Sequence, residues 1–232
     1  MDKGYFITGT DTDVGKTFVA AELLRALGEA GLRTSGFKPV ASGSAWVDGR
    51  LCNQDALALM AESSVKIPYE LVNPYCFEPA IAPHIAAKRV DTAIDFSVIS
   101  AHFERHLAVS DVVVVEAAGG WKVPLNDAKG VDDLAYTLGL PVILVVGLKL
   151  GCINHALLSE QAILDQGCHL AGWVGNSLSE RFEAKSDNIK TLKQRMKSPC
   201  LGVLEYQVNG EHVGIESRRN MSGVLDCLGV FR

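Results

Sequence analysis

The chain has 232 residues, of which 48% are hydrophobic and 21% are charged, enough for one large α/β domain with a substantial core. A net charge of −5 and the lack of a Lys/Arg cluster argue against a nucleic-acid partner. No apolar run reaches the roughly 18 residues that a membrane span needs, so we expect no membrane partner. A single globular domain over residues 1–232 is therefore predicted.

The start of the chain and its cysteines bear on location. Met1 is followed almost directly by the first predicted strand, so no signal peptide is expected. Six cysteines, at positions 52, 76, 152, 168, 200 and 227, form no Cys-x-x-Cys pair and no His/Cys array. Free thiols are typical of a reducing compartment, and we expect a cytoplasmic protein.

The first motif follows a buried strand at residues 4–8. It reads Gly9-Thr10-Asp11-Thr12-Asp13-Val14-Gly15-Lys16-Thr17 and opens a helix predicted from Lys16 to about Gly28. A strand, a glycine loop and Gly-Lys-Thr at a helix start are typical of a phosphate-binding P-loop. Backbone N–H groups and Lys16 would face the phosphates, and the Thr17 hydroxyl can bind Mg²⁺. The motif is a variant, because Gly9 stands one residue before the usual first glycine.

Downstream, apolar strands alternate with helical patterns. We expect strands at 34–39, 111–116, 141–146, 170–174 and 201–204. Helices are expected to start near 54 and to span 96–107, 131–138, 151 onward, 182–196 and 217–229. Residues 41–50 and 117–121 are predicted loops. Residues 67–84 hold half of the eight prolines, which predicts a non-helical excursion over the surface. The alternation indicates an α/β fold like that of P-loop NTPases, an open, mostly parallel sheet with helices on both faces.

Charged and polar side chains follow several of the predicted strands. Because ligands bind beyond the carboxyl ends of such strands, Lys38, Glu116 and Asn176 are candidate site residues beside the P-loop. Glu116 occupies the place where P-loop enzymes often carry a metal-binding aspartate, and Asp55 begins a predicted helix. Together with Thr17, these two carboxylates could hold Mg²⁺. The alternatives are a surface or capping role for Glu116 and an N-cap role for Asp55.

Lys38 would place a second cation opposite Lys16, where it could offset charge on a transferred γ-phosphate. Its alternative is an edge lysine with only its stem buried. Ser42 could hydrogen-bond a polar substrate. Gly151-Cys152-Ile153-Asn154 opens a predicted helix, whose N–H groups and dipole suit a carboxylate. The histidines have no metal-binding spacing and are predicted to be structural.

Six sequence blocks also point to a known family. They are Gly9 to Thr17, Lys38-Pro39-Val40-Ala41-Ser42-Gly43, Asn73-Pro74-Tyr75, Pro83-His84, Glu116-Ala117-Ala118-Gly119-Gly120 and Lys149-Leu150-Gly151-Cys152-Ile153-Asn154-His155. In their order and spacing, over about the first 180 residues, the chain resembles the dethiobiotin synthetases of biotin biosynthesis. The early glycine of the P-loop is a feature of that family.

The resemblance implies a homodimeric cyclo-ligase that depends on Mg²⁺ and uses ATP as a co-substrate. Such an enzyme joins CO₂ to 7,8-diaminononanoate (7,8-diaminopelargonate) and closes the ureido ring of dethiobiotin. The substrate carboxylate would lie on the segment from Gly151 to Asn154 of the partner subunit, and Asn176 would contact the adenine.

The P-loop, the strand-end residues and the resemblance together give the predicted site. Catalytic residues are Lys16 and Lys38. Nucleotide-binding residues are Asp13, Val14, Gly15, Lys16, Thr17, Phe18, Asp55, Glu116, Ala117, Ala118, Gly119, Asn176, Ser177, Glu205, Tyr206 and Gln207. Metal-binding residues are Thr17, Asp55 and Glu116. Substrate-binding residues are Thr12, Lys38, Ser42, Gly151, Cys152, Ile153 and Asn154.

The chain departs from the family pattern at two places. Ala117 stands where the family has glycine, so activity would fall modestly if this position had a positive φ. Residues 203–207 lack the family's Ile-Pro beside the adenine, which leaves the nucleotide preference open, and residues from 208 onward have no counterpart in the resemblance.

Three other functions are alternatives. A P-loop switch protein would carry a lysine where this chain has Asp11. A synthetase acting on another carboxylate would usually need a glutaminase domain, for which 232 residues leave no room. A diverged copy could keep the fold without the activity.

Overall fold

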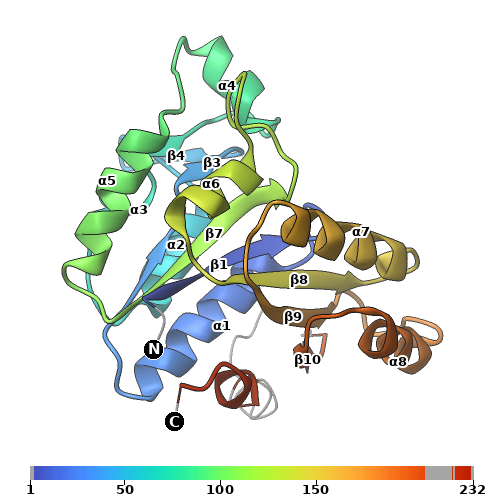
Figure 1. Cartoon of the computed structure of the whole chain (residues 1–232). Coiled ribbons are helices and arrows are strands. Elements are labelled where there is room, and N and C mark those ends of the chain that lie inside the picture. Colours follow the sequence, from blue (N-terminus) through green and yellow to red (C-terminus); the bar gives the residue numbers. More distant parts are fainter. Residues whose placement is uncertain (1–2, 207–220, 222, 231–232) are drawn as a thin grey trace.

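The computed structural model describes residues 3–206, 221 and 223–230. Its centre is a six-stranded parallel sheet in the order β10-β9-β8-β1-β7-β2 (Figure 1). The strands are β1 (Gly4–Gly9), β2 (Thr34–Phe37), β7 (Val112–Gly120), β8 (Val142–Leu148), β9 (Leu170–Ser177) and β10 (Cys200–Leu204). The predicted α/β fold with an open parallel sheet is confirmed.

Helices cover both faces of this sheet. They are α1 (Lys16–Glu29), α2 (Gln54–Glu62), α3 (Tyr69–Val72), α4 (Pro83–Arg89), α5 (Phe96–Leu107), α6 (Val131–Leu138), α7 (Cys152–Asp165) and α8 (Lys185–Arg195). Figure 1 shows α1 and residues 223–230 beneath the sheet, with α5, α6 and α7 on the opposite side. None of the helices in the described residues is both long and apolar enough to cross a bilayer.

The central strands are apolar along their whole length because both faces are covered. In β7, Val113 and Val115 pack into the core beneath α5, α6 and α7, whereas Val112 and Val114 pack into the core beside α1. Strand β1 divides in the same way, with Phe6 in the first core and its two neighbours in the second. Alternation of side chains across a strand thus builds two cores from one apolar run.

The predicted loop at residues 41–50 is wrong in part. It contains β4 (Ala45–Val47), which pairs antiparallel with β5 (Arg50–Cys52) across a turn at Asp48 and Gly49. Both turn residues have a positive φ, 48° and 78°, and Asp-Gly is a favoured pair for such a turn. These strands are too short and too exposed to show an alternating pattern. Nearby, β3 (Val40–Ala41) pairs with β6 (Tyr75–Cys76).

Two further predictions need correction, and the predicted terminal helix is confirmed at residues 221 and 223–227. Residues 67–84 are not free of helix, because α3 forms one turn after Pro68, and proline is well tolerated at a helix start. The predicted loop at 117–121 is largely strand, since β7 runs on to Gly120, which pairs with Gly9. Of the predicted helix at 217–229, residues 221 and 223–227 are helical and 228–230 are a turn, while 217–220 and 222 lie outside the described residues.

Candidate active site

A cavity of about 910 Å³ lies at the carboxyl ends of the sheet strands. It is lined by Thr12, Asp13, Gly15, Lys16, Thr17, Lys38, Ala41, Ser42, Asp55, Ala80, Ile81, Ala82, Pro83, Glu116, Ala118, Gly119 and Val123. Most of the residues predicted around the P-loop are therefore brought together, although they come from segments more than 100 residues apart.

The P-loop turns from β1 into α1 with its backbone packed closely on itself. A Cβ atom at Gly9 would meet Val14 Cγ2 at 2.6 Å and Lys16 Cδ at 3.1 Å, so the early glycine has a steric reason. Lys16 Nζ donates a hydrogen bond to the backbone oxygen of Asp11, at 2.9 Å. This contact holds the ammonium group within the loop, on the side of the cavity.

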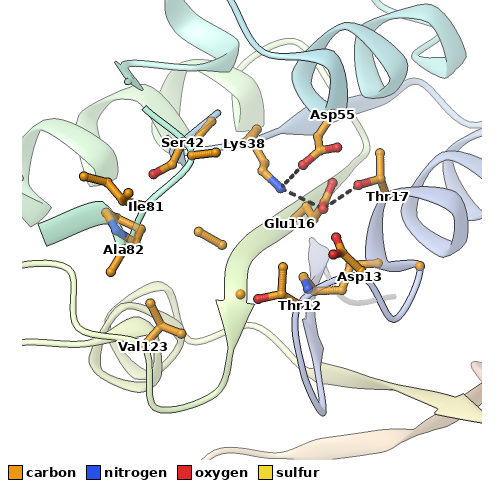
Figure 2. Close-up of a pocket in the computed structure, with 17 residues that line it drawn as sticks. Thr12, Asp13, Thr17, Lys38, Ser42, Asp55, Ile81, Ala82, Glu116 and Val123 are labelled. Atoms are coloured by element: carbon orange, nitrogen blue, oxygen red, sulfur yellow. Dashed lines mark hydrogen bonds and ion pairs between the residues drawn. The ribbon is translucent and has the colours of Figure 1, made fainter. Parts of the chain in front are cut away.

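Lys38 is the centre of a buried polar cluster. Its Nζ lies 2.7 Å from Glu116 Oε1 and 2.8 Å from Asp55 Oδ2, and the Thr17 hydroxyl donates to Glu116 Oε1 at 2.8 Å (Figure 2). Lys38 is 3% exposed and Glu116 is 1% exposed. A snorkelling edge lysine and a surface acid are thus both excluded, and the four predicted residues form one connected group.

Neighbouring elements hold Lys38 and Asp55 in place. Lys38 follows β2, where its N–H donates to Val72 O and its carbonyl accepts from Asn73 Nδ2, at 2.9 and 2.7 Å. Asp55 lies in the first turn of α2, but Asn53 is the N-cap, and its side chain accepts from the N–H groups of Asp55 and Ala56. Asp55 is therefore not the N-cap, and its carboxylate points to Lys38.

Burial and charge act in opposite directions on these groups. Burial alone would lower the pKa of Lys38, but Glu116 and Asp55 hold it above its ordinary value. Burial alone would raise the pKa of Asp55, yet Lys38 keeps it below the ordinary value. Burial raises the pKa of Glu116 despite Lys38. At Lys16, burial and then repulsion by Lys38 lower the pKa. The Glu116 carboxylate therefore depends on a nearby cation.

The residues present fit a divalent cation. Glu116 Oε2 is buried and has no hydrogen-bond partner, so one carboxylate oxygen is left for a further ligand. Asp55 and Thr17 supply two more oxygen atoms, the donor type that Mg²⁺ prefers. Within the described residues no group of three or more His, Cys, Asp or Glu side chains could hold a metal ion. The two carboxylates and the hydroxyl would therefore need phosphate or water oxygens to complete a shell.

The opposite end of the cavity is apolar and was not predicted. Figure 2 shows Ile81, Ala82 and Val123 across from Lys38 and Asp55, and Ala80 and Pro83 complete this wall. The Pro83-His84 block was the only sequence signal for it. Ser42 lies at the edge of the cavity, and its buried hydroxyl has no hydrogen-bond partner, as suits a residue that contacts a ligand.

Several predicted nucleotide-binding residues do not line the cavity. Val14 and Ala117 are packed in the core, and Phe18 and Ser177 also lie outside the lining. Asn176 lies behind the P-loop, where its Nδ2 donates to Val14 O at 3.0 Å. Glu205 forms an ion pair with Lys185, and Tyr206 is exposed. Gln207 lies outside the described residues.

The predicted carboxylate-binding segment opens α7, away from the lining of the cavity. Gly151 is its N-cap, in a left-handed conformation, and Asn154 is exposed. The thiol of Cys152 is buried, so in this fold only the backbone there could face a ligand. The preceding Leu150 is 91% exposed.

Ala117 does not carry the backbone strain that its position suggested. Among the described non-glycine residues it is not one of those with a positive φ. The left-handed residue of this loop is Gly119, at φ 65°, where an added Cβ would lie 2.8 Å from Val123 Cγ2. Alanine is therefore compatible with position 117.

Similarity to known proteins decides the family. A family model described as an AAA domain matches residues 3–210. The ATP-dependent dethiobiotin synthetase BioD of Pseudomonas paraeruginosa is 50% identical over 199 residues, 85% of this chain and 87% of that protein. The protein of the same name from Yersinia pestis is 43% identical over 226 residues, 97% of this chain and 94% of that protein. The chain belongs to the dethiobiotin synthetase family. The resemblance found in the six sequence blocks is confirmed.

Solved structures with the same fold are more distant in sequence. The septum site-determining protein MinD of Pyrococcus horikoshii, in complex with Mg-ADP, aligns over 100% of this chain and 97% of its own, with a TM-score of 0.60 and 15% identity. MinD of Aquifex aeolicus aligns over 99% of this chain and 98% of its own, with a TM-score of 0.62 and 13% identity. At such identities they show that this dethiobiotin synthetase family member has the P-loop NTPase fold.

Proposed function

We propose that the chain is an ATP-dependent cyclo-ligase that converts 7,8-diaminononanoate and CO₂ into dethiobiotin, with release of ADP and phosphate. Family membership supports this activity. The observation in the structure that carries it is the cavity itself, which joins the P-loop and Lys38 at one end to the apolar wall at Ile81 and Val123 at the other. A substrate with two amines on an aliphatic chain would fit a cavity with one charged end and one apolar end.

The reaction needs positive charge but no covalent enzyme nucleophile. One substrate amine attacks CO₂ and loses a proton, which forms a carbamate. A carbamate oxygen then attacks the γ-phosphate, and ADP leaves. The second amine attacks the carbon of the resulting carbamic–phosphoric anhydride, so that the ring closes and phosphate leaves. Lys16 and Lys38 would stabilise the charge that develops on the phosphoryl oxygens and the carbamate.

Thr17, Asp55 and Glu116 are the residues that would hold Mg²⁺, on the strength of the unpartnered Glu116 Oε2 and the oxygen donor set. When bound, the ion would neutralise phosphate charge. The remaining proposed contacts of Mg²⁺·ATP are the P-loop N–H groups, Ala118 and Gly119, with Asn176 toward the adenine.

A homodimer is part of the proposal. The N–H groups of Ile153 and Asn154 lie in the first turn of α7, where they have no intrahelical acceptor. They do not line the cavity of their own chain, so a partner subunit would have to bring them to the substrate carboxylate. A cytoplasmic location is proposed from the six cysteines, all of which are free thiols.

To test the reaction, the protein is incubated with the diamine, labelled bicarbonate, ATP and Mg²⁺. We expect labelled dethiobiotin in amounts equal to the phosphate released. Phosphate release that does not depend on the diamine would contradict the ligase and favour a diverged ATPase.

Lys38→Met should slow ring closure about 10²–10³-fold, because one charge facing the transferred phosphoryl group is lost. ADP binding, measured by calorimetry, should persist, since the P-loop contacts remain. Lys122→Met, at an exposed lysine outside the cavity, is the matched control and should retain normal turnover. Equal turnover for Lys38→Met and the wild type would refute the assignment of Lys38.

Mixed dimers test the shared site. A Lys16→Met subunit and an Asn154→Pro subunit are each defective in one half of the site, so a mixture should regain part of the activity. Absence of rescue, with mixed dimers demonstrated by mass spectrometry, would count against the contribution of the partner subunit.

A further inference from the structure

We propose that the Lys38 ammonium group takes the place of the divalent cation in the nucleotide-free protein, so that metal binding displaces Lys38 from the carboxylates. The proposal rests on the metal site of the proposed function, and it adds a regulatory step to that site. Lys38 would become available to an acceptor only after the metal has arrived.

The geometry places one ammonium group between the two carboxylates proposed to bind the metal, and the third proposed ligand, Thr17, is hydrogen-bonded to one of them. Lys38 Nζ contacts Glu116 Oε1 at 2.7 Å and Asp55 Oδ2 at 2.8 Å, and Thr17 donates to the same Glu116 oxygen. Figure 2 shows these contacts converging between α2, β7 and the P-loop. A metal ion that takes the unpartnered Glu116 Oε2 and an oxygen of Asp55 would lie between the same two side chains as Lys38 Nζ, so the two cations would compete for this place.

Burial makes this competition strong. A buried carboxylate without a cation is costly, and the Glu116 side chain is 1% exposed. In the absence of metal, Lys38 supplies the positive charge that keeps Glu116 and Asp55 together. Once Mg²⁺ is present, the ammonium and the metal repel each other at short range in a poorly solvated place. We therefore expect the Lys38 ammonium group to leave the carboxylates when the metal binds.

The cavity offers space for a displaced Lys38 side chain. It lines the cavity together with Ser42, whose buried hydroxyl has no hydrogen-bond partner. A rotation of the lysine side chain away from Glu116 would bring Nζ into the cavity, toward the side on which a carbamate would lie. Loading of the metal and delivery of Lys38 would then be one event.

The test measures metal binding without nucleotide, so it does not depend on ligase activity. Mn²⁺ is the probe, and its free concentration is followed by electron paramagnetic resonance. Lys38→Met removes the competing ammonium and should bind Mn²⁺ at least about tenfold more tightly than the wild type. Lys122→Met breaks another Lys–Asp pair and makes the same change in net charge, so its Mn²⁺ affinity should equal that of the wild type. Equal affinities for Lys38→Met and the wild type overturn the proposal.

A second measurement uses the wild-type protein, so that it does not depend on metal binding by the Lys38→Met variant. The Nζ group of a buried, ion-paired lysine exchanges slowly enough to be followed by ¹⁵N NMR, and Lys38→Arg assigns its signal. Mg²⁺ with ADP should shift this signal, while ADP with a chelator should leave it unchanged. A Lys38 signal that stays in place when Mg²⁺ saturates the site would mean that metal and lysine bind together, which contradicts displacement. Neither measurement depends on turnover, so a failed ligase assay would contradict the proposed function without contradicting displacement of Lys38 by the metal.

Discussion

Ala117 and Gly119 show how two neighbouring positions of one loop differ in what they tolerate. Ala117 continues β7 and is buried in the core, whereas Gly119 turns the chain with φ 65° beside Val123. The family pattern alone suggested that alanine at 117 could weaken the enzyme. The backbone places the need for glycine two residues later.

We therefore expect alanine to be the more stable residue at position 117 and glycine to be the more stable residue at position 119. Ala117→Gly should leave turnover unchanged and lower the free energy of unfolding by roughly 0.5–1 kcal/mol, because glycine loses more backbone entropy in a strand. Gly119→Ala should cost about 1–2 kcal/mol from the left-handed backbone, with an added clash against Val123. Guanidinium titrations measure both. Higher turnover in Ala117→Gly would show that alanine does impair the loop.

At the residue scale, the sequence predicted which side chains meet but not how they pair. Lys38, Glu116 and Asp55 each follow a recognisable strand end or helix start. Their mutual hydrogen bonds depend on the position of α2 relative to β7, which no local pattern encodes. The apolar wall at Ile81 was missed for a related reason, since a short irregular segment rich in proline has no periodicity.

At the scale of single elements, α2 depends on a cap at Asn53, which excludes the N-cap role that the sequence left open as the alternative for Asp55. Asn53 accepts two N–H groups of the first turn, and its own N–H donates to Tyr69 Oη at 2.7 Å. Because Asn53 carries this role, the side chain of Asp55, two residues later, can face Lys38. Both Asn and Asp are good caps, so composition alone could not separate them.

Asn53→Ala should lower the free energy of unfolding by about 1 kcal/mol, as expected for loss of an N-cap. It should also weaken Mg²⁺-dependent ADP binding, because the first turn of α2 carries Asp55. Asp95→Ala is the matched control, since Asp95 caps α5 through the N–H of Ser97 at 2.8 Å and lies outside the cavity lining. It should lose similar stability and keep its ADP affinity. Equal losses of ADP affinity in both variants would exclude a specific role for the α2 cap.

At the scale of the whole molecule, His106 connects three parts of the fold. It lies on α5, its Nδ1 is 2.9 Å from the hydroxyl of Ser35 on β2, and its Nε2 is 3.2 Å from the carbonyl of Leu71 in α3. A carbonyl only accepts, so Nε2 carries the proton and Nδ1 accepts from Ser35. Burial lowers the pKa of His106 to about 4.

This histidine should make stability depend on pH. Between about pH 6.5 and 4 the unfolded chain binds a proton at His106 and the folded chain does not, so stability falls as the pH falls through this range. The full loss is about 3 kcal/mol, from a pKa difference of about 2.5. Urea titrations at pH 7.5 and 5 should show a smaller loss for His106→Gln than for the wild type. His169 is exposed, so His169→Gln should lose as much unfolding free energy between pH 7.5 and 5 as the wild type does. If His106→Gln also lost as much as the wild type, His106 would not be the source of the pH dependence.

The overall sheet was the most predictable part of the molecule. Val112 to Val115 and Val142 to Val146 are uninterrupted apolar runs, which only a strand covered on both faces explains. The strand order was not predictable in the same way, because parallel strands of similar composition can be arranged in several orders. The hairpin from Ala45 to Cys52 was missed because its side chains are mostly exposed and leave no hydrophobic signature.

The pairing of β1 between β7 and β8 has a consequence for the way the protein is made. Thr10 of the P-loop donates its N–H to Val145 O at 3.0 Å, and Ile7 pairs with both Glu116 and Ile143. At about 5–20 residues per second, a ribosome needs roughly 7 to 27 seconds to extend the chain from the first strand to these partners. Until β7 and then β8 have been synthesised, β1 lacks its two partner strands, so ATP should bind only after β8 has left the exit tunnel.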